Sequence, residues 1–285
     1  MPQSAPRFLI AESGTPEDRK ARRDDVGKSS GETFAATLRQ MVPGCNLTIA
    51  QPSDEGAPAV TDRQLTSYDA VFVSGSPMHA YERTPAVERQ LEFMRAVFRS
   101  GVPSFGSCAG LQAAVAAAGG TVRAMEPRME AGISRGIAAS DAGRAHPLLK
   151  GRPTVWDAPA LHGDEVEQLP SGAQLLAGNG ATRVQAAEIR FERGIFWGVQ
   201  YHPELSIGEI GAALKRQADT LVQSGLAKDT GKVSDQAALY LALDRDPANI
   251  PLRWRLGVDG EFADEGRRRL ELRNFIRALG DLDRR

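Results

Sequence analysis

Apolar and polar segments alternate along the first half of the chain. Apolar runs of strand length lie at 8–11, 47–50, 69–73 and 102–105. The segment 85–100 places apolar residues on one helical side, and 109–118 consists almost entirely of strong helix formers, so both predict helices. Strands that alternate with helices are typical of a mostly parallel open sheet covered on both faces. We therefore expect a three-layer α/β domain.

The pattern changes after residue 120, where short apolar runs are separated by turns. Strands are expected there at 121–124, 154–156, 174–177, 186–191 and 194–201. We expect some of these strands to pair antiparallel. A helix over 206–225 and a polar linker over 225–235 are predicted to follow.

The last part of the chain carries two further helical patterns, at 237–243 and 262–279. We therefore divide the chain into a domain at 1–225 and a helical extension at 226–285. Five residues of the extension would form an apolar stripe: Leu270, Leu272, Phe275, Ile276 and Leu279. We favour packing of this stripe on the preceding domain, and the alternative is a docking helix for a partner or a second copy of the chain.

The charged segment 12–25 is predicted to be a solvated loop, long enough to act as a lid. Gly27-Lys28-Ser29 does not form a phosphate-binding loop, because the required first glycine is replaced by Arg22 and no strand leads into it. Ser29 and Glu32 instead predict a capping box that opens a helix over 30–41.

Composition and charge describe an ordinary globular protein of 285 residues, with 41% hydrophobic and 25% charged residues. The formal charge of −1 gives no reason to expect nucleic acid or an anionic membrane as a partner. No apolar run has the length of a transmembrane helix. Two cysteines, Cys45 and Cys108, make a disulfide framework improbable and indicate a cytoplasmic location. Cys45 is interpreted as structural.

Residues 105–112 (Phe-Gly-Ser-Cys-Ala-Gly-Leu-Gln) predict a sharp turn between a strand and a helix, with Cys108 at the apex. Gly106 and Gly110 flank the cysteine and permit a strained turn. A cysteine at a helix N-terminus is biased toward thiolate by the helix dipole, and the free N–H groups there can hold an oxyanion. The alternative interpretation is a buried structural cysteine.

His202-Pro203-Glu204 follows the second strong strand. The residue before proline is extended, so His202 and Glu204 should point to the same side. A histidine oriented by a carboxylate and placed near a cysteine forms a complete nucleophile, base and orienting group. Without Cys108, His202 would be interpreted as a structural histidine.

Residues 106–112 and 198–204 resemble the nucleophile and His-Pro-Glu motifs of class I glutamine amidotransferases, a resemblance that covers about 8–221. Within that family, the motifs of the chain look closest to those of the glutaminase domain of GMP synthase. Residues 161–166 (Leu-His-Gly-Asp-Glu-Val) resemble its Ser-His-Gly-Asp-x-Val loop, and 128–132 (Arg-Met-Glu-Ala-Gly) resemble its basic-x-Glu-x-Gly segment. The resemblance implies a flavodoxin-like fold.

The resemblance also implies hydrolysis of the glutamine side-chain amide. Cys108 would form a glutamyl thioester, His202 would transfer protons, and Glu204 would hold His202. The implied oxyanion and substrate-binding positions are Ser76, Ala109, Gln112, Gly163 and Asp164, the last two mainly through backbone contacts. No metal or organic cofactor is expected.

Two departures from the family pattern concern the same loop. The family usually has Gly-Gly-Pro or Asn-Gly-Pro where this chain has Gly75-Ser76-Pro77. Ser76 therefore carries a Cβ atom where the family has glycine, which bears on how the oxyanion loop is held and on glutaminase efficiency. Met78-His79 is also unusual, and we interpret His79 as an exposed loop histidine rather than a functional one. Of the other histidines, His162 is expected near the site without being the base, and His146 is expected to begin a turn.

GMP synthase carries an ATP-pyrophosphatase domain after its glutaminase domain, whereas about 60 residues without a phosphate-loop signal follow Gly225 here. We therefore expect that an amidotransferase reaction would use a separate synthetase subunit. We expect L-glutamine or a γ-glutamyl compound as substrate, with a homo-oligomer as a further possibility. One alternative is a stand-alone γ-glutamyl hydrolase. The other is a non-catalytic regulatory module that retains the fold.

Overall fold

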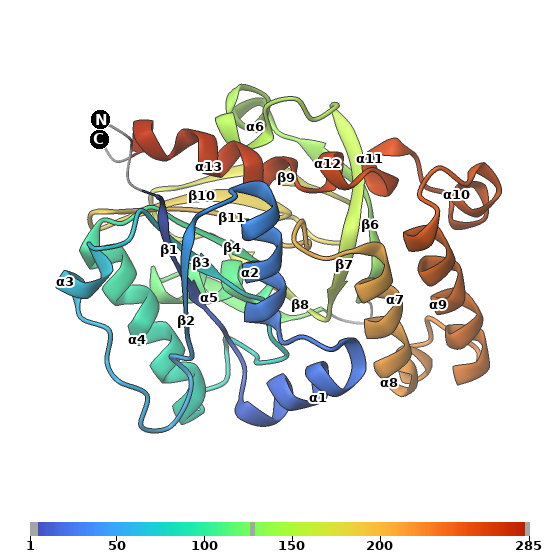
Figure 1. Cartoon of the computed structure of the whole chain (residues 1–285), viewed down its shortest axis with the longest axis horizontal. Coiled ribbons are helices and arrows are strands. Elements are labelled where there is room, and N and C mark those ends of the chain that lie inside the picture. Colours follow the sequence, from blue (N-terminus) through green and yellow to red (C-terminus); the bar gives the residue numbers. More distant parts are fainter. Residues whose placement is uncertain (1–4, 126–128, 283–285) are drawn as a thin grey trace.

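The computed structural model describes residues 5–125 and 129–282. Within these residues, the strands form a mixed nine-stranded sheet and a small two-stranded sheet, with helices on both faces of the large sheet (Figure 1). The predicted α/β fold is confirmed. No helix in the described part of the chain is long and apolar enough to cross a membrane.

The large sheet has a parallel half and an antiparallel half. In spatial order, the parallel half consists of β2 (Asn46–Ala50), β1 (Arg7–Ala11), β3 (Ala70–Val73), β4 (Ser104–Ser107) and β11 (Gly194–Val199). The antiparallel half continues with β10 (Ala186–Phe191), β9 (Ala173–Gly178), β6 (Glu130–Ala139) and β7 (Val155–His162). The small sheet pairs β5 (Thr121–Ala124) with β8 (Asp164–Gln168).

The inner strands are buried on both faces, so their side chains alternate between two apolar cores. Leu9 and Val71 face one core, and Phe8 and Phe72 face the other. The first core is covered by α3 (Asp62–Leu65), α4 (Pro85–Ser100) and α5 (Ala109–Ala117), and the second by α2 (Ser30–Met41) and α13 (Leu270–Leu282). The near-continuous apolar runs of these strands follow from this two-sided burial.

Most of the remaining helices surround the antiparallel half of the sheet. They are α6 (Asp141–Ala145), the 3₁₀ turn η1 (Pro147–Leu149), α7 (Ile207–Arg216), α8 (Ala218–Gln223), α9 (Thr230–Arg245), α10 (Ile250–Leu256), α11 (Gly260–Ala263) and α12 (Glu265–Arg268). Side chains of α7 to α10 form a third apolar core with residues of β6 and β7.

The C-terminal helix α13 packs directly on the central sheet. The Phe275 ring lies 5.5 Å from the Phe72 ring and 5.8 Å from the Trp197 ring, both in edge-to-face arrangements. The predicted packing of the apolar stripe on the preceding domain is therefore confirmed. The division of the chain at residue 225 stays a prediction.

The charged segment predicted to be a loop contains a helix, α1 (Pro16–Val26). Thr15 and Asp18 form a capping box at its start, and Arg19 pairs with Asp54 at 2.6 Å. This helix was missed because it carries almost no apolar residues, so no hydrophobic period marks it. Local capping and ion pairs stabilise it instead.

Other boundaries also differ from the prediction. The expected helix over 206–225 is interrupted at Gln217, and α9 begins at Thr230, inside the expected linker. The strands β6 and β8 were not predicted. In β6, the pairing register shifts between Ser134 and Ile137, and this irregularity breaks the alternation by which a strand is identified.

The topology brings three loops to one edge of the sheet. Because β3, β4 and β11 are parallel neighbours, their carboxyl ends lie side by side. The loops after them begin at Ser74, Cys108 and Gln200 respectively. This edge is where ligands bind in open α/β sheets.

Candidate active site

Cys108 lies at the apex of a sharp turn between β4 and α5. Its φ of 52° is in the left-handed region that non-glycine residues rarely adopt, and its amide donates to the Val199 carbonyl at 2.8 Å. A Cβ atom on Gly110 would lie 2.5 Å from the Val73 carbonyl oxygen, and one on Gly106 would lie 3.0 Å from the Gly110 carbonyl carbon. Both glycines therefore allow the close approach that the predicted turn requires.

The His202 side chain pairs with Glu204 and lies beside Cys108. His202 Nδ1 lies 2.7 Å from Glu204 Oε1, and a Cβ atom on Gly75 would lie 2.9 Å from His202 Cε1 and 3.5 Å from Cys108 Cβ, so the imidazole and the cysteine border the same point. All three side chains are buried. Burial opposes a charge on His202, but the Glu204 carboxylate and the Cys108 sulfur outweigh it and raise the His202 pKa to about 10. The imidazole is therefore protonated at neutral pH.

Glu204 is itself held by neighbouring hydroxyl groups. Ser107 Oγ donates to Glu204 Oε1 at 2.9 Å, and the Thr37 hydroxyl donates to the Glu204 backbone carbonyl at 3.1 Å. Because Ser107 immediately precedes Cys108, the same turn positions the cysteine and supports the carboxylate that orients His202. The structure brings these predicted residues together from two adjacent loops.

The loop after β3 passes beside the imidazole. A Cβ atom on Gly75 would lie 2.9 Å from His202 Cε1, so a larger residue there would displace the ring. The next residue, Ser76, accepts a hydrogen bond from the Met78 amide at 3.2 Å. Ser76 and Ala109, the two predicted oxyanion positions, line the same small cavity.

The predicted substrate-binding residues meet at the turn between β7 and β8. Gln112 Nε2 donates to the Asp164 carbonyl at 3.1 Å and to Gln200 Oε1 at 3.2 Å. Gly163 lies in this turn, and a Cβ atom there would have no neighbour within 4 Å. The turn is therefore tied to α5 on one side and faces open space on the other.

His79 is part of this region, although the sequence favoured an exposed loop histidine. Its side chain is 45% exposed, yet His79 Nδ1 lies 2.6 Å from Asp164 Oδ2. The Tyr81 hydroxyl donates to Asp164 Oδ1 at 3.3 Å, and burial together with the Asp164 charge raises the Tyr81 pKa to about 12. His79 and Tyr81 thus join the loop after β3 to Asp164. The unusual Met78-His79 dipeptide was the one sequence signal for this contact.

A buried polar network supports the same turn from behind. His162 Nε2 lies 2.9 Å from Glu130 Oε2, and its Nδ1 lies 2.9 Å from the Asp164 carbonyl oxygen. Burial opposes the charge on Glu130, but hydrogen bonds from His162, Asn179 and Ser134 lower its pKa. His162 lies near the site as predicted, and it positions the turn. Arg128, the basic residue of the predicted Glu130 segment, lies outside the described residues.

His146 caps the turn η1, as predicted, by accepting a hydrogen bond from the Leu148 amide at 3.1 Å. Its Nε2 lies 3.1 Å from Glu188 Oε2. Across residues 5–125 and 129–282, no group of three His, Cys, Asp or Glu side chains is arranged to hold a metal ion.

Comparisons with known proteins identify the family of the chain. The model of a family described as glutamine amidotransferase class-I matches residues 24–218. The chain is 38% identical over 247 residues to a gamma-glutamyl-L-1-hydroxyisopropylamide hydrolase from Pseudomonas sp, and the match covers 86% of this chain and 82% of that relative.

Two weaker similarities extend the comparison. The chain is 33% identical over 205 residues to a glutamine-hydrolysing GMP synthase from Methylobacillus flagellatus, and the match covers 67% of this chain but only 34% of the synthase. The crystal structure of a glutamine amidotransferase from Thermotoga maritima shares the fold, with a TM-score of 0.63 at 15% identity. That match covers 97% of this chain and 99% of the other.

Proposed function

Because the chain belongs to the class I glutamine amidotransferase family, we propose that it hydrolyses the γ-amide bond of a γ-glutamyl amine through Cys108, His202 and Glu204. The observation that carries this proposal is one buried imidazole that pairs with a carboxylate and lies beside a helix-terminal cysteine. The relative that matches most of both chains is named a γ-glutamyl amide hydrolase. This favours the stand-alone hydrolase, the alternative in the sequence analysis, over a glutaminase.

The first half of the reaction forms a thioester. The Cys108 thiolate, paired with the protonated His202, attacks the γ-carbonyl carbon, and a C–S bond forms. The backbone N–H groups of Ala109 and Ser76 receive the oxyanion, and the N-terminal end of α5 adds its positive dipole. The C–N bond then breaks, and the departing amine takes the proton from His202.

The second half releases the γ-carboxylate product. The neutral His202 accepts a proton from a water molecule, and the resulting hydroxide attacks the thioester carbon. The C–S bond breaks and Cys108 leaves as a thiolate beside His202, which keeps the proton taken from water. The product acid loses its own proton to solvent and leaves as the γ-carboxylate. Glu204 holds the ring in one orientation throughout, and its charge stabilises the imidazolium.

The glutamyl part of the substrate is assigned to the turn between β7 and β8. Gly163 borders open space, and Asp164 offers a carboxylate that can attract the α-ammonium group of a glutamyl substrate. Gln112 holds the backbone of this turn, so its contribution is mainly positional. His79 and Tyr81 fix the Asp164 side chain from the loop after β3.

The second candidate is a glutaminase that supplies ammonia to a separate synthetase subunit. It is supported by the similarity to GMP synthases, of which the chain spans about a third of the length. Within this candidate, the synthetase partner, a homo-oligomer and a cytoplasmic location remain predictions from the sequence.

The test is product release by the purified chain. Ammonia release from L-glutamine is measured beside ethylamine release from γ-glutamyl ethylamide. Cys108→Ser is the inactive variant, and Cys45→Ser is the matched control, because it removes the other thiol of the chain. We expect ethylamine release that is lost in Cys108→Ser and unchanged in Cys45→Ser.

Three other results would contradict the proposed hydrolase or its nucleophile. Faster turnover of glutamine than of the ethylamide would favour the glutaminase candidate. Turnover that survives in Cys108→Ser would refute the proposed nucleophile. If neither substrate is turned over and Cys108 also resists a glutamine-like electrophile, the regulatory module is favoured instead.

A further inference from the structure

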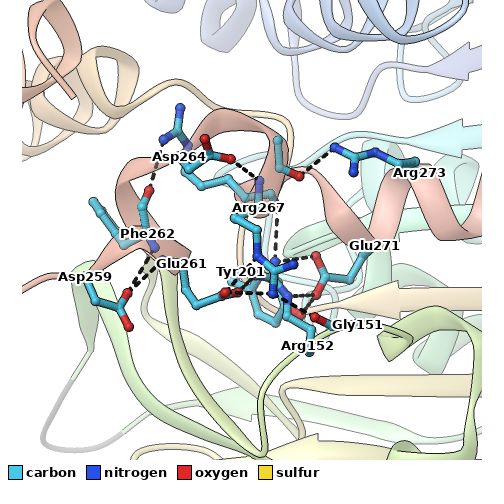
Figure 2. Close-up of polar contacts among 12 residues, drawn as sticks. Gly151, Arg152, Tyr201, Asp259, Glu261, Phe262, Asp264, Arg267, Glu271 and Arg273 are labelled. Carbon is cyan, nitrogen blue, oxygen red and sulfur yellow. Dashed lines mark hydrogen bonds and ion pairs between the residues drawn. The ribbon is translucent and has the colours of Figure 1, made fainter. Parts of the chain in front are cut away.

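A buried carboxylate of the C-terminal helix α13 reaches the strand end that carries His202. Glu271 is fully buried, and its Oε1 accepts a hydrogen bond from the Tyr201 hydroxyl at 2.8 Å. Burial and the Glu271 charge raise the Tyr201 pKa, so the phenol keeps its proton and donates. Tyr201 directly precedes His202 in the chain. This hydrogen bond therefore joins Glu271 to Tyr201, which lies 70 positions earlier in the chain (Figure 2).

The Glu271 carboxylate is fixed by a two-point contact with Arg152. Arg152 Nε donates to Glu271 Oε1 at 2.7 Å, and Arg152 Nη2 donates to Glu271 Oε2 at 2.8 Å. The guanidinium also donates to Glu261 Oε2 at 2.9 Å and lies over the Trp156 ring. Figure 2 shows Arg152 between Glu261 and Glu271, with Tyr201 beside them. A fork of this kind holds a carboxylate in one orientation.

The backbone around Tyr201 has little freedom to absorb a change. The Tyr201 ring is fully buried and lies 6.5 Å from the Trp156 ring in an edge-to-face arrangement. The His202 amide donates to the Pro159 carbonyl at 2.8 Å. The imidazole also packs closely against Gly75, because a Cβ atom on Gly75 would lie 2.9 Å from His202 Cε1. The phenol therefore acts as one anchor of a tightly held segment.

We propose that Glu271 is a positioning residue for His202, acting through the Tyr201 hydroxyl, so that the C-terminal helices form part of the catalytic unit. This inference rests on the proposed function of His202. Glu271 touches neither substrate nor the reacting atoms. It limits the positions that the His202 ring can occupy relative to Cys108.

The experiment compares three variants in a Cys45→Ser background, in which Cys108 is the remaining thiol. Tyr201→Phe removes only the hydroxyl, and Glu271→Gln removes the charge. Glu261→Gln is the matched control, because Glu261 bonds to the same Arg152 without touching Tyr201. Thermal unfolding is measured for each variant, together with kcat and KM for the γ-glutamyl amide. The rate of Cys108 alkylation by iodoacetamide at neutral pH is the third measurement.

We expect Tyr201→Phe to lower kcat roughly tenfold to a hundredfold with little change in KM, because a small misplacement of a catalytic group is costly. Cys108 alkylation should slow as well, since the thiolate loses its well-placed imidazolium partner. Glu271→Gln should match Tyr201→Phe where it folds. Glu261→Gln should lower the unfolding temperature and leave both kcat and the alkylation rate unchanged.

A folded Tyr201→Phe protein with wild-type kcat and alkylation rate would overturn the proposal. So would a Glu261→Gln protein as impaired as Tyr201→Phe, because the effect would then reflect general loosening of the extension. Alkylation requires no substrate. If the wild-type chain cleaves no γ-glutamyl amide, the proposed function fails while the alkylation rates still test the positioning role.

Discussion

Glu204→Gln isolates the electrostatic part of the site, because it keeps the shape of the side chain and removes its charge. Glu204 is almost completely buried, and its Oε1 is shared by His202 and Ser107. The amide oxygen of glutamine can still accept a hydrogen bond from one of these donors, but the neutral amide does not stabilise a positive charge on the imidazole. We therefore expect His202 to lose its proton at a much lower pH in this variant.

The structure sets the size of this effect. A rise of the His202 pKa from its ordinary value of 6.5 to about 10 corresponds to about 5 kcal/mol of preference for the charged imidazole. Burial works against the charge, so the Glu204 and Cys108 charges must supply this preference and the burial cost as well. Replacing an orienting triad carboxylate by its amide costs on the order of 10⁴-fold in kcat, and we expect a loss of that order.

The same change alters the dependence of stability on pH. The folded wild-type protein binds a proton on His202 more tightly than the unfolded chain does. Its contribution to the free energy of unfolding is therefore complete below about pH 6.5 and declines by about 1.4 kcal/mol per pH unit until about pH 10. In Glu204→Gln we expect this decline to flatten.

The assays are kcat on the γ-glutamyl amide, urea unfolding across this pH range, and NMR titration of the His202 ring. Glu188→Gln is the matched control, because Glu188 forms a second buried pair with a histidine, His146. It should lose stability and keep its kcat. A Glu204→Gln protein with wild-type turnover, or with a His202 titration unchanged from the wild type, would refute the reasoning.

Three further substitutions test the packing of the site. Gly110→Ala would place a Cβ atom 2.5 Å from the Val73 carbonyl oxygen, and urea unfolding should show a loss of about 1–3 kcal/mol or more; unchanged stability would contradict the close contact. Gly75→Ala should displace the His202 ring and lower kcat on the order of 100-fold in a folded protein, a result that a crystal structure with an unmoved ring would argue against. His79→Ala should raise KM roughly tenfold, because the Asp164 carboxylate loses its contact with His79. A fall in kcat alone would assign another role to His79.

The residues expected to do the chemistry could be found from local sequence patterns. The glycines beside Cys108 and the proline after His202 constrain the backbone over a few residues, and the side chains follow from that constraint. His79 could not be interpreted in this way, because its partner Asp164 lies 85 positions away. The Tyr201 contact with Glu271 was hidden for the same reason.

The elements of the fold that local sequence patterns mark were predicted, and those without such a pattern were missed. Strands buried on both faces, such as β1 and β3, appear as unbroken apolar runs and were predicted. Helix α1 was missed because its stability comes from a capping box and ion pairs rather than from an apolar face. Strand β6 was missed because a register shift breaks its alternation.

The amino-acid sequence by itself determined the α/β alternation, the strained turn at Cys108 and the extended His202-Pro203-Glu204 segment, because each depends on interactions between near neighbours. Tertiary structure alone decided which loops meet at the sheet edge, and it placed Glu271 against Tyr201. The physical reason is that a buried charge must find a partner wherever the packed chain supplies one, and the distance along the sequence does not enter that requirement.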